Sequence, residues 1–232
     1  MSTFMLDLTM NSHLRAGVDR TSPRSRRAVE SEFARACLAV GGHINQRNHA
    51  RCLKLGASLG ISYHTVQRYV DVLERTFLVR RLRPYFRNVG KRLAKAPKLY
   101  LRDTGLLHHL LNISTLDQLD QHPARGASWE TFVVEDILRR EAVAHPDSQA
   151  YFWRTAAGAE VDLVIERADR RVAVEAKTAR GGSARAVRTL REALPDIDAS
   201  RAWIVDQASG IERLADNIAR GGFQDLLEGV PE

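Results

Sequence analysis

Charged residues stand in the middle of the most apolar strands that this sequence predicts. The stretch "EVDLVIERADRRVAVEAKT", residues 160–178, is typical of two β-strands joined by a polar turn. Asp162, Glu175 and Lys177 lie inside these strands, and burying an unpaired charge is costly. The three side chains therefore either face water or bind something, and this choice constrains both the fold and the function.

The elements around this stretch predict a mixed β-sheet with helices on its faces. One helix starts after Ser128, a plausible N-cap residue, in "SWETFVVEDILRREAV". The predicted strands span 151–155, 160–167, 171–179 and 201–207, and a second helix spans 183–194. This order of helix, three strands, helix and strand is typical of an α/β domain.

Strand alternation places the charges on definite faces. Glu175 and Lys177 share one side of their strand, and Asp162 can lie beside Glu175 if the two strands pair. Neighbouring carboxylates repel each other unless a cation lies between them, and Mg²⁺ or Mn²⁺ takes such oxygen ligands. Lys177 would then stabilise charge on a phosphate or orient the attacking water. This arrangement suits metal-assisted phosphodiester hydrolysis. The alternative is a plain ion pair between Glu175 and Lys177, which contributes little at a surface.

The charge of the 232-residue chain is unevenly distributed. Residues 1–125 contain 21 Lys and Arg against 9 Asp and Glu, whereas residues 126–232 contain 14 against 19. The basic half is expected to meet a polyanion, and the second half to do other work. A solvated basic surface without a partner is the alternative.

The basic half has the pattern of a helix-turn-helix. Helical stretches are predicted near 33–40 and 46–58, and the turn "SLGIS" leads into a helix over 63–76. The second helix of such a motif enters the major groove of DNA. Its outer side carries the predicted DNA contacts Tyr63, His64, Gln67 and Arg68. An ordinary helical hairpin is the alternative.

A basic hairpin is predicted directly after the helix-turn-helix. The segment between Glu74 and Asp103 contains no acid and alternates like a β-hairpin at both ends. A basic hairpin in this place is the order of a winged helix. Its side chains would contact DNA phosphates without reading the base sequence. The predicted phosphate contacts are Arg80, Arg81, Arg83, Arg87, Lys91, Arg92, Lys95 and Lys98.

We therefore expect two structured regions behind a basic arm. The expected division is an arm over 1–30, a winged helix-turn-helix over 31–103, a helix and linker over 104–125 with Asp103 as N-cap, and an α/β domain over 126–232. No apolar run is long enough to cross a bilayer, and the start lacks a secretory signal. A cytoplasmic protein without a membrane partner is expected.

The carboxylates and lysine of the second region resemble the PD-(D/E)xK nuclease core. The resemblance rests on Asp162, then Glu175-x-Lys177 after a β-hairpin, with Glu130 on the preceding helix. It implies the fold of restriction endonucleases and Holliday-junction resolvases. By resemblance, Asp162 and Glu175 are metal ligands, Lys177 is the catalytic lysine and Glu130 is an accessory helix acid.

A longer resemblance covers the chain from about residue 33. The segments "LGASLGISYHTVQRYVDVLERTFLVRRLRPYF", "HPARGASWETFVVEDIL" and "YFWRTAAGAEVDLVIE" are similar to the C-terminal region of a large group of prokaryotic AAA-type ATPases. In that group a P-loop module precedes a winged helix and a nuclease-like domain of unknown function. This sequence contains no G-x-x-x-x-G-K-[ST], so no ATP site is expected here. An ATPase partner or self-association is implied instead.

Three hypotheses follow for a fold that combines a winged helix-turn-helix with a restriction-endonuclease-like α/β domain, α+β overall. The first is a metal-dependent DNA endonuclease that uses the acids and lysine named above. The second is a catalytically silent DNA- or protein-interaction module of an ATPase. The third is a truncated remnant that aggregates through a former ATPase interface. Fold alone does not choose between them, because function depends on the site.

Overall fold

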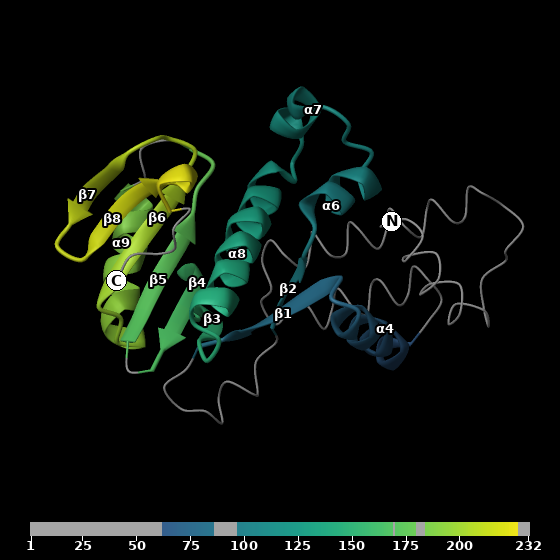
Figure 1. Cartoon of the computed structure of the whole chain (residues 1–232), viewed down its shortest axis with the longest axis horizontal. Coiled ribbons are helices and arrows are strands. Elements are labelled where there is room, and N and C mark those ends of the chain that lie inside the picture. Colours follow the sequence, from purple (N-terminus) through teal and green to yellow (C-terminus); the bar gives the residue numbers. More distant parts are fainter. Residues whose placement is uncertain (1–61, 86–96, 169, 180–183, 227–232) are drawn as a thin grey trace, which may run out of the picture.

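A computed structural model of the chain describes residues 62–85, 97–168, 170–179 and 184–226 (Figure 1). The helices of this part are α4 (Tyr63–Arg75), α6 (Thr104–Leu110), α7 (Leu116–Gln121), α8 (Arg125–Ala144), α9 (Ala184–Ile197) and the 3-10 turn η2 (Phe223–Leu226). The strands are β1 (Val79–Pro84), β2 (Lys98–Leu101), β3 (Gln149–Arg154), β4 (Glu160–Arg167), β5 (Arg170–Ala176), β6 (Arg201–Asp206), β7 (Ile211–Ala215) and β8 (Ile218–Gly222).

These strands form one mixed sheet in the order β2-β1-β3-β4-β5-β6-β8-β7. The pairs β1–β2, β3–β4, β4–β5 and β7–β8 are antiparallel, whereas β1–β3, β5–β6 and β6–β8 are parallel. The mixed α/β class predicted from the sequence is therefore confirmed. The β-hairpin and helix pattern over residues 149–206 also agrees with the prediction to within a few residues.

Strands β1 and β2, which form the base of the predicted basic hairpin, belong to this sheet. Arg83 and Pro84 of β1 pair in parallel with Tyr151 and Phe152 of β3. The expected division near Gly126 lies inside the first turn of α8. Strands from both sides of that division thus share one sheet, because β1 finds a partner that is distant in sequence.

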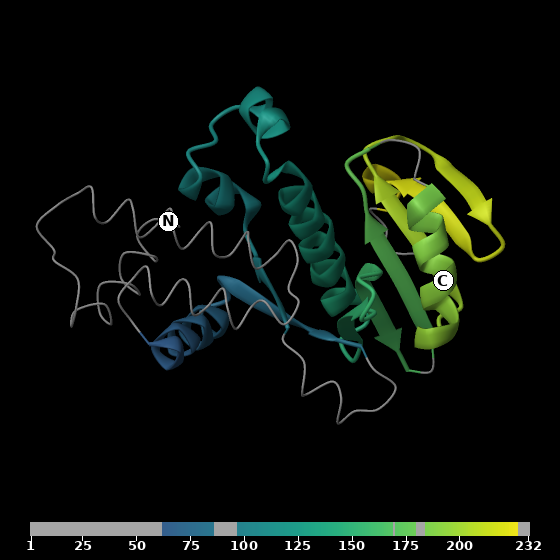
Figure 2. The same cartoon turned by 180° about the vertical axis from the view of Figure 1, so that it is seen from behind.

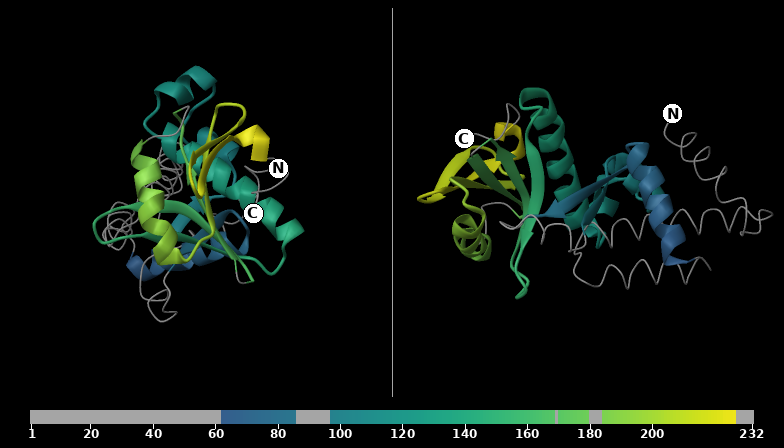
Figure 3. Two further views of the ribbon diagram at one scale, coloured as in Figure 1. Left: turned by 90° about the vertical axis from the view of Figure 1, so that its left-hand side faces the viewer. Right: turned by 90° about the horizontal axis from the view of Figure 1, so that it is seen from below.

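Helices α8 and α9 cover opposite faces of the sheet (Figures 2 and 3). Val133, Val134, Ile137 and Leu138 of α8 pack into a core with alternate strand residues such as Leu163. On the other face of the sheet, the buried side of α9 packs against strand residues such as Val161 and Val164. This side of α9 comprises Ala186, Leu190, Ala193 and Ile197. Both helices are thus amphipathic in the sense that the sequence predicts.

A third, smaller core lies where α4 and α6 meet β1 and β2. Leu73, Val79, Leu101 and Leu107 are buried in it. The predicted cap of α6 is confirmed, since Oδ1 of Asp103 accepts a hydrogen bond from the Leu106 amide at 2.8 Å.

The predicted cap of α8 is wrong. This helix begins one turn earlier than expected, with Ala124 at its N-cap, so Ser128 lies buried inside it. Its hydroxyl is 2.6 Å from Nε2 of His108 on α6. Burial lowers the pKa of His108. This contact therefore joins α6 to α8.

The predicted helix over 63–76 is observed as α4, but the other parts of the helix-turn-helix lie outside the described residues. So do the basic arm and the tip of the basic hairpin, which includes Arg87, Lys91, Arg92 and Lys95. None of the helices in the described part of the chain is long and apolar enough to span a membrane.

Candidate functional site

The ladder between β4 and β5 stops at the carboxylates. Its last backbone pair on this side is Leu163 with Val174. Beyond it, the Ala176 amide donates to Oδ2 of Asp162 at 3.0 Å, and the Asp162 amide donates to Oε2 of Glu175 at 3.3 Å. Side-chain oxygens thus take the places that backbone carbonyls occupy in a regular ladder. The sequence expectation that Asp162 lies beside Glu175 agrees with this geometry.

A bulge in β4 contributes to the position of Asp162. Val161 pairs with Trp153 and Val164 pairs with Tyr151, so two residues of β4 stand opposite one residue of β3. Such a bulge re-aims a side chain relative to strict alternation. Asp162 then faces the same side as Leu163, the side covered by α8.

Lys98 of β2 reaches into the carboxylates from another part of the chain. Its Nζ atom is 2.9 Å from Oε1 of Glu130 and 3.3 Å from Oδ1 of Asp162. It also forms an ion pair with Glu160. Lys98 is fully buried, and Tyr100 donates from its hydroxyl to Oε1 of Glu130 at 2.7 Å.

Two further bases complete the group. Lys177 forms an ion pair with Glu175, and its side chain is 34% exposed. Arg154 is 2.5 Å from Oε2 of Glu160. We call the whole set the acid–base cluster. It comprises the acids Glu130, Glu160, Asp162 and Glu175 and the bases Lys98, Arg154 and Lys177.

The structure therefore brings together all four residues predicted for the catalytic site, namely Glu130, Asp162, Glu175 and Lys177. Glu130 comes from the first turns of α8, Asp162 from β4, and the other two from the end of β5. Sequence reasoning did not find Lys98, Arg154 or Glu160 as members, nor Tyr100 as a partner of Glu130. Lys98 and Tyr100 alternate in "KLYL", which indicates that they share a face, but nothing local indicates which face is buried.

The prediction that Lys98 contacts DNA is wrong. A side chain with no exposed surface cannot touch a phosphate. The misplaced prediction arose because Lys98 follows a run of basic residues, whereas its partners are acids on α8 and β4.

Burial and mutual repulsion shift the protonation of the cluster. Burial, followed by the charge of Asp162, raises the pKa of Glu130 to about 7 and that of Glu175 to about 8. Burial by itself lowers the pKa of Lys98, but the surrounding acids outweigh it and raise that pKa well above its usual value. For Lys177, too, the charge of Glu175 overcomes burial and raises the pKa. Both lysines therefore stay charged at neutral pH.

The cluster in this arrangement does not fit a divalent metal. Each oxygen of Asp162 already has a partner, Lys98 for one and the Ala176 amide for the other. The oxygens of Glu175 are likewise engaged by Lys177 and by the Asp162 amide. Within the described ranges, no three His, Cys, Asp or Glu residues are grouped in a way that could hold a metal ion. In this arrangement the oxygens of Asp162 and Glu175, the predicted Mg²⁺ or Mn²⁺ ligands, are engaged by groups of the protein itself.

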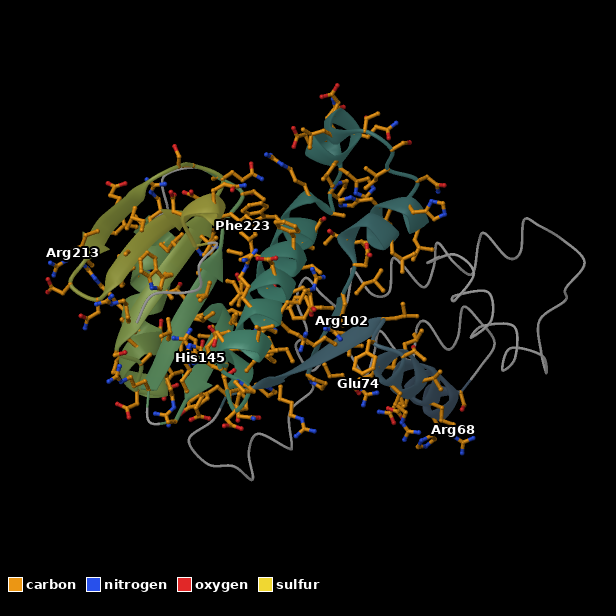
Figure 4. The ribbon with its side chains drawn as sticks, in the orientation of Figure 1. Arg68, Glu74, Arg102, His145, Arg213 and Phe223 are labelled. Atoms are coloured by element: carbon orange, nitrogen blue, oxygen red, sulfur yellow. The ribbon has the colours of Figure 1, made fainter. Side chains whose placement is uncertain are left out.

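The predicted DNA contacts on α4 lie on the surface. His64, Gln67 and Arg68 are exposed. Arg68, in the middle of α4, lies farther from the sheet than Glu74 does (Figure 4). Tyr63 is the first residue of α4, and its side chain is outside the described part of the structure.

The predicted contacts on β1 divide into two kinds. Arg80 forms an ion pair at 2.5 Å with Glu135, and Arg81 pairs with Asp71 and, at 3.2 Å, with Glu74. These two arginines join β1 to α8 and α4 and are half-buried. Arg83 is exposed.

Two family models match the chain, and the first ends within α7 while the second begins at the start of α8. Residues 18–117 match a family described as a domain of unknown function (DUF8612), and residues 125–220 match another domain of unknown function (DUF4143). Uncharacterised proteins of Mycobacterium tuberculosis (strain ATCC 25618 / H37Rv) and Mycobacterium bovis (strain ATCC BAA-935 / AF2122/97) are each 41% identical to the chain over 152 residues. These alignments cover 66% of this chain and 33% of each relative. The chain thus spans about a third of the length of the curated relatives it matches, and it is similar to two families whose descriptions leave the function open.

Proposed function

We propose that this chain is a DNA-binding module of the kind that accompanies AAA-type ATPases, and that its nuclease-like cluster is catalytically silent. The observation that carries the proposal is a contrast between two sets of cations. Lys98, Arg80 and Arg154, which lie against the sheet, are all in ion pairs. Arg68, Arg75 and Arg83 are exposed, and no residue of the described part forms an ion pair with them.

This contrast supports an interface for a polyanion. A cation that is paired within the protein has little charge left to offer, whereas an unpaired, exposed one attracts phosphate and releases counterions on binding. Arg68 and Arg75 are seven residues apart, so they lie on the same side of α4 two turns apart. His64, four residues before Arg68, is on that side as well. The outer side of α4 is thus the best candidate for contact with DNA.

The acid–base cluster supports the catalytically silent part of the proposal. A metal-dependent nuclease needs carboxylate oxygens that are free to bind cations and a metal-bound water. Here a buried ammonium stands between Glu130 and Asp162, and both acids are less than a fifth exposed. The ion pairs hold β2, α8 and β4 together.

The link to an ATPase rests on resemblance and on length. The family matched by residues 125–220 is commonly associated with AAA-type ATPases. The curated relatives extend well beyond the aligned region. An ATPase module that acts together with this chain would therefore supply the ATP chemistry that the sequence lacks.

Fluorescence anisotropy with a labelled DNA duplex tests the proposal. Wild type should bind at low salt and release DNA as salt increases. The double variant Arg68→Ala/Arg75→Ala should bind at least tenfold more weakly. Arg213→Ala is the matched control, because Arg213 is exposed on β7 at the opposite end of the molecule (Figure 4). Equal affinity of the double variant and the control would contradict the proposed interface.

The second candidate function is a metal-dependent DNA nuclease. The observation that favours it is the convergence of Glu130, Asp162, Glu175 and Lys177 from three elements. Cleavage of plasmid, linear, single-stranded and branched DNA should be measured with Mg²⁺ and Mn²⁺. Cleavage by wild type that disappears in folded Asp162→Ala and Lys177→Ala variants would establish this function and overturn the catalytically silent one.

A further inference from the structure

We infer that Lys98 is a built-in cation that takes the place of a divalent metal, and that removing its charge turns the cluster into a metal site. The inference concerns the cluster alone and does not depend on DNA binding. The residue types of the cluster resemble those of a metal centre, but the Lys98 ammonium occupies the space between the acids, so no place is left for a metal.

The position of the ammonium is the first argument. Its Nζ atom lies within ion-pair distance of three carboxylates, those of Glu130, Glu160 and Asp162. The ammonium donates hydrogen bonds to Glu130 and Asp162 and forms an ion pair with Glu160, so three acids surround one positive charge. Glu130 and Asp162 come from different elements, α8 and β4, and Lys98 is the side chain that touches both. A cation placed between these acids would have to displace it.

The charge balance is the second argument. The cluster contains four acids and the three bases Lys98, Arg154 and Lys177. Lys98 supplies one of the three positive charges, and neutralising it leaves four acids facing two bases, an excess of acid that favours a bound cation.

The third argument is burial. Lys98 has no exposed surface, and Asp162 and Glu175 are less than a tenth exposed. An isolated ammonium is not retained in such a place, because desolvation costs several kcal/mol unless partners compensate it. Here Glu130, Glu160 and Asp162 surround the ammonium and supply those partners. A hydrated metal ion in the same place would have to lose most of its water.

The test measures Mn²⁺ binding by the full chain, using calorimetry and the electron paramagnetic resonance signal of free Mn²⁺. Wild type should show no stoichiometric site, and its melting temperature should be the same in EDTA and in Mn²⁺. Lys98→Met keeps most of the side-chain volume and removes the charge. It should bind one Mn²⁺ per chain at least tenfold more tightly than wild type, and Mn²⁺ should raise its melting temperature.

Lys177→Met is the matched control. It removes one positive charge from the same cluster but leaves the Lys98 ammonium in place, so no comparable site should form. Adding Asp162→Asn to Lys98→Met should abolish the new site. A stoichiometric site in wild type that Asp162→Asn removes would overturn the inference. So would equal Mn²⁺ binding by the two lysine variants.

A variant with better charge balance covers the case in which Lys98→Met does not fold. Lys98→Met/Glu160→Gln removes one charge of each sign and leaves Glu130, Asp162 and Glu175. If this double variant folds and still fails to bind Mn²⁺, the inference is wrong. Binding of one Mn²⁺ by it supports the inference as directly as the single variant would.

Discussion

The amide of Ala176 donates a hydrogen bond to Oδ2 of Asp162 at 3.0 Å. A side-chain oxygen thus serves as the acceptor that a neighbouring strand would normally provide, at the point where β4 and β5 separate. The other oxygen of the same carboxylate, Oδ1, receives the Lys98 ammonium. One buried side chain therefore both completes the sheet and anchors the acid–base cluster.

Asp162→Ala should lower the free energy of unfolding. It leaves the buried Ala176 amide and one contact of Lys98 unsatisfied, and an unsatisfied buried group costs about 1–3 kcal/mol. Asp162→Asn should cost less, because its amide oxygen can still accept from Ala176. Urea unfolding followed by circular dichroism measures both values. Equal losses in the two variants would show that the hydrogen bond to Ala176 contributes nothing.

Glu175→Gln should remove much of the pH dependence of stability. The folded protein raises the pKa of this carboxyl to about 8, above its value of 4.5 in an unfolded chain. The folded state thus holds a proton that the unfolded state has lost, and stability falls as pH rises from about 4.5 to 8. One unit of pKa corresponds to about 1.4 kcal/mol, so wild type should lose at least that much over this range.

The measurement is the free energy of unfolding of both proteins between pH 5 and pH 8.5. Glu130, whose pKa is raised to about 7, acts in the same direction, so the curve of Glu175→Gln should become flatter but keep a slope. Glu166→Gln is the control, because Glu166 pairs with Arg171 at 2.7 Å outside the acid–base cluster. The prediction fails if Glu175→Gln retains the full wild-type slope.

Sequence periodicity located the helices and strands whose own residues show a clear hydrophobic pattern. The predicted strand over 160–167 coincides with β4, and the helix predicted over 63–76 agrees with α4 to within one residue. Both patterns are local: a short apolar run bounded by polar residues in one and an amphipathic stripe in the other. Asp162 and Glu175 were found because charges inside apolar strands stand out, whereas Glu130 came from the resemblance and Glu160 was not found.

What sequence reasoning missed depends on contacts between distant segments. The pairing of β1 with β3 places Lys98 near acids at least 32 residues away in the sequence, and no local pattern encodes that distance. The outermost hairpin was also missed. Its strand β7 reads "IERLA" and is largely exposed, and its partner β8 contains Gly221 and Gly222, so neither has a clear alternation.

Glu135→Ala should destabilise the junction between β1, β2 and α8. Glu135 is almost completely buried and pairs with Arg80 at 2.5 Å and with Arg102 at 3.1 Å. Both arginines are about a quarter exposed and can turn to water, so the loss should be about 1–3 kcal/mol, below the cost for a fully buried pair. Asp136→Ala, one residue along the same helix, removes the i,i+4 pair with Arg140 and should cost under about 0.5 kcal/mol.

The same pair of variants tests whether the two halves of the chain unfold together. Because β1 and β2 are part of the sheet, Glu135→Ala should shift one cooperative transition to lower urea concentration. Tryptophan fluorescence and circular dichroism should report the same midpoint. Two separate transitions would indicate that α4, β1 and β2 form an independent unit, as the sequence alone suggested.

The salt dependence of DNA affinity should reveal how many phosphates α4 contacts. Each phosphate neutralised by the protein contributes about 0.9 to the slope of log K against log salt concentration. Arg68→Ala/Arg75→Ala should therefore lower the slope by about 2 if both side chains contact phosphates. Gln67→Ala carries no charge change and should leave the slope unaltered. An unchanged slope in the arginine variant would place the phosphate contacts elsewhere.

Gly222→Ala should disrupt the end of β8. A Cβ atom at this position would lie 1.8 Å from the carbonyl oxygen of Ala208, a backbone atom that cannot move aside alone. The loop after β6 would have to shift, and such overpacking typically costs about 1–3 kcal/mol.

Gly126→Ala is the matched control, because a Cβ there meets nothing within 4 Å. Since Gly126 lies inside α8, its substitution should instead stabilise the protein by up to about 1 kcal/mol. Thermal unfolding of both variants should therefore shift in opposite directions, and a common direction would contradict the close approach of β8 to Ala208.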